Sequence, residues 1–149
     1  MAANINPIFS RTWDIQIAGA VIGTTANTAT DGTGSGITRI FTADATEGGF
    51  IYKVIFKSIS TTAATVIRLF YCSDTGAFTP GTTNTAANTT LIGEISTASW
   101  TASNTTASPI YEIPVMMGIP ASTKLLVAFG TSTGAATTGF NPIVMAGKY

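Results

Sequence analysis

The side chains that could perform chemistry are few and scattered in this chain of 149 residues. Cys72 is the one cysteine, and there is no histidine to activate it as a nucleophile. Asp44 and Glu47 could act as paired carboxylates in acid–base or metal chemistry, but no third ligand lies near them in sequence. We therefore expect Cys72 to be a small buried hydrophobe and the two acids to be solvated turn residues.

A glycine-rich segment at residues 31–36 (DGTGSG) is the other candidate for chemistry. A phosphate-binding loop needs a strand before it and a helix after it, because the helix N-terminus supplies the amide donors. No strand leads directly into this segment, and residues 37–42 have a strand pattern. A turn or flexible loop is the better interpretation, so we predict no enzymatic activity and no metal or cofactor.

The composition also excludes several classes of partner. Charged residues make up 9% of the chain, seven basic and seven acidic, where about 25% is usual. No basic patch is present to neutralise phosphates, and the apolar runs are far shorter than the ~18 residues of a membrane helix. We expect no nucleic-acid or membrane partner and no signal peptide, and a surface that tolerates protein neighbours.

The residue pattern predicts a β-protein. Thr is the commonest residue and Ile outnumbers Leu, and such β-branched residues suit a pleated sheet. We predict a single-domain β-sandwich, jelly-roll-like, with about eight antiparallel strands over residues 12–149, preceded by an N-terminal arm at residues 1–11. The predicted strands are residues 12–18, 37–42, 49–59, 65–72, 91–96, 110–115, 124–130 and 140–149.

Residues 49–72 are the densest apolar region and predict two long strands, either a core hairpin or two adjacent core strands. Alternation places Phe50 and Tyr52 on the core face and Lys53 and Lys57 on the opposite face. That opposite face is either solvated, with lysine stems covering apolar surface, or a contact face for a neighbouring subunit.

The other strands have distinct expected positions. Residues 65–72 are apolar on both faces and predict a central strand, and residues 124–130 predict a buried one. Pro109 and Pro114 place residues 110–115 at a sheet edge, because proline cannot donate to a ladder. In residues 12–18 Trp13 and Ile15 share one face with Ile17, which predicts a half-buried strand.

Several apolar residues outside the central strands are candidates for partner contacts. The arm either docks on a partner or packs on its own domain. Phe78 lies in a long loop and packs either on the sandwich or on a partner, and Trp100 is either an interface anchor or a lid on the core. The candidate partner-contact residues are Ile5, Pro7, Ile8, Phe9, Trp13, Lys53, Lys57, Phe78 and Trp100.

Five segments carry a resemblance to a known group of proteins. They are NTATDGTG at residues 27–34, RIFTA at 39–43, TTAATVIRLF at 61–70, GIPA at 118–121 and AGKY at 146–149. In this order they resemble small virion structural proteins of tailed bacteriophages, of the head decoration or cement type, over most of residues 24–149.

The resemblance implies a β-sandwich module that sits on an assembled capsid and stabilises it. The implied partner is the major capsid protein, the implied state is a homo-oligomer, with a trimer favoured, and the implied place is the virion exterior after synthesis in the host cytoplasm. An alternative is another virion part: a head-fibre base, a tail component or a carbohydrate-binding attachment domain, which would contact its ligand at Trp100, Phe78 or Tyr111.

Overall fold

The computed structural model describes residues 12–17, 22–133 and 139–149 of the chain. These residues form eight antiparallel β-strands in two four-stranded sheets and no helix, which confirms the predicted all-β sandwich. The strands are β1 (Thr12–Ile17), β2 (Ile37–Thr42), β3 (Gly49–Ser58), β4 (Thr65–Cys72), β5 (Thr89–Thr97), β6 (Ile110–Ile119), β7 (Lys124–Phe129) and β8 (Phe140–Lys148).

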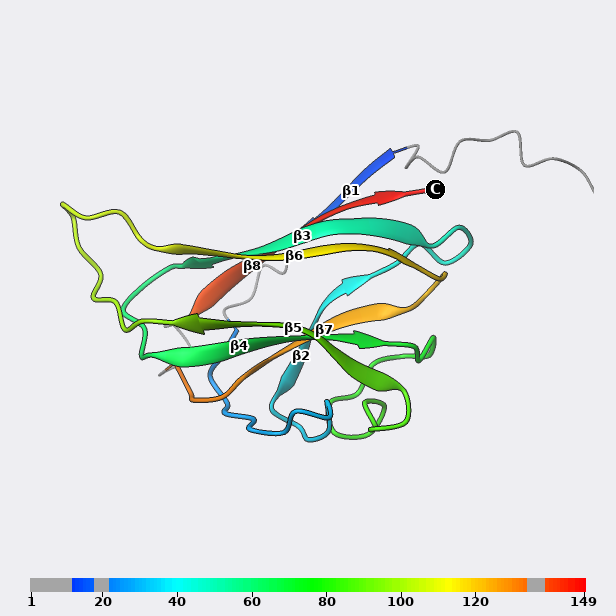
Figure 1. Cartoon of the computed structure of the whole chain (residues 1–149), viewed down its shortest axis with the longest axis horizontal. Helices are drawn as coiled ribbons and strands as arrows, with labels where there is room; N and C mark the ends of the chain where they lie inside the picture. Colours follow the sequence, from blue (N-terminus) through cyan, green and yellow to red (C-terminus); the bar gives the residue numbers. More distant parts are fainter. Residues whose placement is uncertain (1–11, 18–21, 134–138) are drawn as a thin grey trace, which may run out of the picture.

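The two sheets lie as separate layers, seen edge-on in Figure 1. The first, here called sheet A, has the strand order β1-β8-β3-β6, and the second, sheet B, has the order β2-β7-β4-β5. The pairs β1–β8, β2–β7, β3–β6 and β4–β5 are nested, as in a ribbon folded over itself, which is compatible with the predicted jelly-roll-like order. The central position of β4, the edge position of β6 and the full burial of β7 are confirmed.

The predicted pairing of the two long strands is wrong. β3 lies in sheet A and β4 in sheet B, so the turn between them crosses from one layer to the other. Each strand instead pairs with two partners that are distant in sequence: β3 with β6 and β8, and β4 with β5 and β7. Both strands are thus central, and each contributes one face to the shared core.

The core between the sheets corrects the predicted faces of β3. Its fully buried residues are Ile51, Val54 and Phe56, whereas Phe50 and Tyr52, predicted to be core, are only half-buried. The register of β3 against both neighbours shifts between Ile51 and Lys53, so the inward set skips from Ile51 to Val54. A shift of one residue exchanges the inward and outward side chains of the strand on one side of the bulge.

The outer face of sheet B carries a second apolar cluster. Its buried residues are Ile37, Phe70, Cys72, Leu126 and Ala128. Phe78 packs against this cluster, so of the two predicted alternatives it packs on its own sandwich. Cys72 is fully buried, as predicted. The segments that follow β4 and precede β2 lie below sheet B in Figure 1 and cover this cluster.

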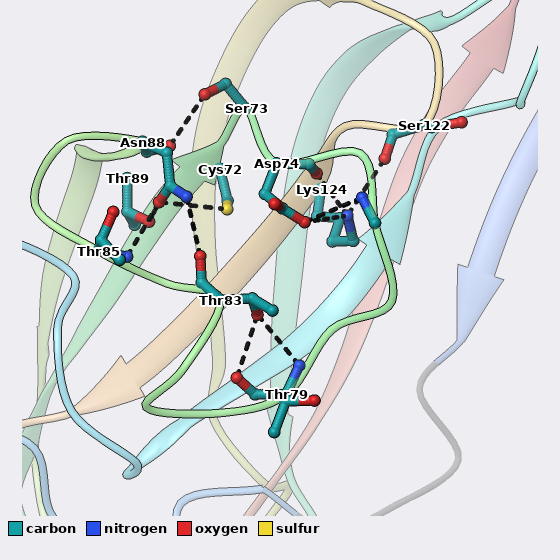
Figure 2. A network of polar contacts seen from close by, with 11 residues as sticks. Cys72, Ser73, Asp74, Thr79, Thr83, Thr85, Asn88, Thr89, Ser122 and Lys124 are labelled. Atoms are coloured by element: carbon teal, nitrogen blue, oxygen red, sulfur yellow. Dashed lines mark hydrogen bonds and ion pairs between the residues drawn. The ribbon is translucent and has the colours of Figure 1, made fainter.

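Polar contacts hold the segment after β4 in place (Figure 2). The Asn88 amide donates to the Thr83 carbonyl at 2.8 Å, and its oxygen accepts from the Thr85 amide at 2.9 Å. The ammonium of Lys124, a buried residue of β7, donates to the backbone carbonyl of Asp74. The segment is therefore a fixed cover for sheet B, because its backbone groups find partners within the domain.

Asn84 joins the two covering segments to each other. Its side chain is buried, and its amide nitrogen donates to the carbonyls of Gly32 at 2.7 Å and Gly34 at 3.0 Å. Its amide oxygen accepts from the Gly81 N–H at 2.7 Å. The buried Asn84 amide and the carbonyl of the buried Gly32 would otherwise lack these partners, and leaving a buried polar group unpaired is costly.

We predict that Asn84→Asp lowers the free energy of unfolding by about 2–3 kcal/mol. The carboxylate keeps the size of the amide but offers no donor to the two glycine carbonyls. Denaturant unfolding at pH 7 measures the change, with the exposed Thr82→Ala in the same segment as the control. Equal stability of Asn84→Asp and the wild type would contradict the role given to Asn84.

Candidate interaction surface

The outer face of sheet A carries the most prominent surface feature of the described residues. The cross-strand register aligns its side chains in rows, for example Ile15, Met145, Lys53 and Pro114 across the four strands. The face consists of Trp13, Ile15, Phe50, Tyr52, Lys53, Ile55, Lys57, Ile110, Glu112, Pro114, Met116, Ile143 and Met145. Most of these side chains are apolar, whereas the solvent-exposed face of an antiparallel sheet is usually polar.

Four large apolar side chains of this face are well exposed. The exposed fractions are 67% for Trp13, 53% for Ile15, 59% for Ile110 and 66% for Met116. Single exposed apolar residues are normal on a protein, but a contiguous group marks an interaction site. In the described part of the chain no segment covers this face, in contrast to sheet B (Figure 1).

The exposure of β1 corrects the prediction that this strand buries Trp13 and Ile15. Asp14 and Gln16 occupy the inward face instead. The Gln16 amide donates to the Thr42 carbonyl at 2.9 Å, and its oxygen accepts from the Thr42 N–H at 3.2 Å. This pair of bonds joins the edge of sheet A to the edge of sheet B, so the apolar residues of β1 point outward.

Aromatic rings gather at one end of the face. The ring centroids of Trp13 and Tyr52 are 5.6 Å apart, and those of Phe50 and Tyr52 are 5.0 Å apart. The Tyr149 hydroxyl lies above Gly118, where a Cβ would come within 2.6 Å of it. Trp and Tyr are the residues most often responsible for binding energy at interfaces, so this end is the natural centre of a contact.

The charges of the face are sparse. Lys53 and Glu112 form an ion pair at 3.0 Å across β3 and β6. Lys57 is exposed and has no ion pair within the described residues. Both lysines share this face with Ile55, as predicted, and their role in a subunit contact stays a prediction.

The remaining candidate residues lie elsewhere. Trp100 is half-buried, and its N–H and carbonyl exchange hydrogen bonds with Thr62 at 3.0 and 2.8 Å, where two connections meet at the end of the sandwich. Phe78 lies on the opposite sheet. Outside the described residues are Ile5, Pro7, Ile8 and Phe9. Sequence reasoning missed Met116 and Ile110 as surface residues, although the alternation of β6 places both on the outer face; the expected strand ended at Val115, four residues before its observed end at Ile119.

A polar hollow of about 390 Å³ lies beside β1. Its lining residues are Thr12, Trp13, Asp14, Gln16, Thr42, Asp44 and Lys148. The Asp44 carboxylate accepts from the Thr46 N–H at 2.9 Å, the Thr46 hydroxyl at 2.8 Å and the Glu47 N–H at 3.1 Å. These bonds, with Lys148 at 3.6 Å, lower the pKa of Asp44 from 3.8 to about 2. Asp44 thus serves to fix the turn before β3.

No protein-family model, curated protein or solved structure matches this chain. Within the described residues no helix is long and apolar enough to cross a membrane. The same residues contain no group of three or more Cys, Asp and Glu side chains that could hold a metal ion. The outer face of sheet A is therefore the feature from which a function can be argued.

We predict that Asp44 titrates with a midpoint of about 2, measured by NMR of its carboxyl carbon. Because this pKa is below its usual value, Asp44 stabilises the fold above about pH 4 and ceases to do so as the pH falls toward 2. Thr46→Val removes the hydroxyl donor and should raise the midpoint toward 3.8, whereas Thr46→Ser should leave it low. An unchanged midpoint in Thr46→Val would contradict this account.

Proposed function

We propose that this protein is a non-enzymatic head decoration, or cement, protein of a tailed bacteriophage. It binds the assembled shell of the major capsid protein on the virion exterior through the outer face of sheet A, and it stabilises that shell. The resemblance of residues 27–34 and 61–70 supports the class of protein. The observation that carries the proposal is the exposed apolar face of sheet A, which no described segment covers, opposite a sheet that is covered by its own loops.

The size of the face favours attachment in many copies. Neighbouring strands are about 4.8 Å apart and residues rise about 3.3 Å along a strand, so four strands over residues 50–57 of β3 span about 500 Å² in plan. A stable interface buries about 800 Å² on each partner. A contact of this size is weak alone, but a shell that binds many copies with mutual contacts retains them by avidity.

The charges favour a partner that differs from this chain. If two copies packed through this face, each would present Glu112, which is already paired with Lys53, and Lys57 would gain no partner. Burying an unpaired ammonium is costly, so the complementary surface should be apolar and carry a carboxylate opposite Lys57. The homo-oligomer that the resemblance implies would then form through another surface.

We predict that Ile15→Glu weakens binding to shells that lack the protein by at least about tenfold, equivalent to 1.4 kcal/mol. Ile15 is exposed at a sheet edge, so the charge is tolerated in the free protein but is desolvated in the contact. Cosedimentation with purified shells measures binding, and the heat resistance of the shells measures stabilisation.

The matched control is Ala86→Glu, an exposed position in the segment that covers sheet B. It adds the same charge on the opposite side of the sandwich and should bind like the wild type. Wild-type protein that does not bind shells would overturn the proposed function and favour another virion part. Shell binding that Ile15→Glu leaves intact would move the contact away from sheet A.

A further inference from the structure

Met116 has an unusual backbone for its residue type. Its φ is 49°, and Ser122 is the other non-glycine with positive φ in the described chain. A side chain on Cβ is strained in this left-handed region, which favours glycine. Pro114 of β6 pairs with Lys53 of β3, and Met117 pairs with Ile51. Two residues of β6, Val115 and Met116, therefore lie opposite one residue of β3, so Met116 lies in a bulge with one extra residue.

The strained backbone does not place the Met116 side chain in the core. Its neighbours Val115 and Met117 pack against the core cluster, and Ile119 is buried within it. Met116 itself is 66% exposed and belongs to neither apolar cluster. A strained residue that is largely exposed and lies outside both apolar clusters favours a conformation that serves a partner, since such strain persists where function needs it.

The same strand is unsuited to contact through its backbone edge. Pro114 has no N–H to donate, and the bulge interrupts the regular ladder next to it. A partner that added a strand to β6 would meet these irregularities. Engagement must therefore come from side chains on the outer face, and among its large apolar side chains Met116 is one of the two most exposed.

We propose that Met116 is the anchor of the outer face of sheet A and fills an apolar pocket on the surface of the shell protein. This inference rests on the proposed function and names the residue through which the contact is made. An unbranched thioether side chain suits the task, because it adapts to an irregular apolar pocket. The ion pair of Lys53 and Glu112 flanks the anchor along the same two strands and adds polar character to the rim.

The test compares Met116→Gly with Ser122→Gly. Both substitutions place glycine at a positive φ, so both variants should have a melting temperature equal to or above that of the wild type. Only Met116→Gly should lose affinity for shells, by at least tenfold in cosedimentation. Met116→Leu keeps an apolar side chain at the same point and should recover most of the lost affinity.

The outcomes separate this inference from the proposed function. If the wild type does not bind shells, the proposed function fails and the anchor fails with it. If the wild type binds and Met116→Gly binds equally well, the anchor alone is wrong and the face stands. If Met116→Gly has a lower melting temperature than the wild type while Ser122→Gly does not, Met116 stabilises the fold itself, which also overturns the inference.

Discussion

Two packed sheets have four faces, and packing them together buries only two. In a chain with 45% hydrophobic residues and few charges, the other two faces must be covered or must remain as apolar surface. Sheet B is covered by its own loops, which are fixed by Asn84, Asn88 and the buried Lys124. Sheet A has no such cover in the described residues, and the proposed function follows from that asymmetry.

The bulges shape the uncovered face. Met145, Lys53 and Pro114 pair across β8, β3 and β6, and so do Ala146, Ile51 and Met117. Between these two rows β8 has no residue, β3 has one and β6 has two, so each strand toward the β6 edge contains one more residue. A sheet with this graded excess bends and twists more strongly at that edge. The bulge in β3 moves Phe50 and Tyr52 out of the core, beside Trp13, whereas Met116 faces outward by the regular alternation of β6. The aromatic side chains of the face that come from β3 therefore owe their exposure to this bulge.

The strands could be predicted from the sequence because alternation and β-branched residues are local signals. Seven of the eight lie within two residues of the expected bounds, whereas β6 continues to Ile119, past its expected end at Val115. The pairing of the strands and the inward or outward direction of their side chains could not be predicted as well. The pairing of β3 with β8 joins residues far apart in sequence, and the polar inward face of β1 depends on Thr42, in another sheet. Trp13 is exposed although its strand was expected to be half-buried, and Met116 was missed because the strand that carries it was expected to end at Val115.

An exposed apolar face and a sparsely charged surface both suit the crowded lattice of the proposed function. A free protein with such a face associates with unsuitable partners unless charges repel them, and this chain has seven of each sign. On a lattice the same lack of charge lets neighbouring copies approach closely, and each adds contacts that a single copy lacks. A rigid sandwich suits this role because a small contact cannot also supply the cost of ordering loops. Under the proposed function, the fixed cover of sheet B would thus contribute to binding indirectly, since it would keep the domain rigid while sheet A made the contact.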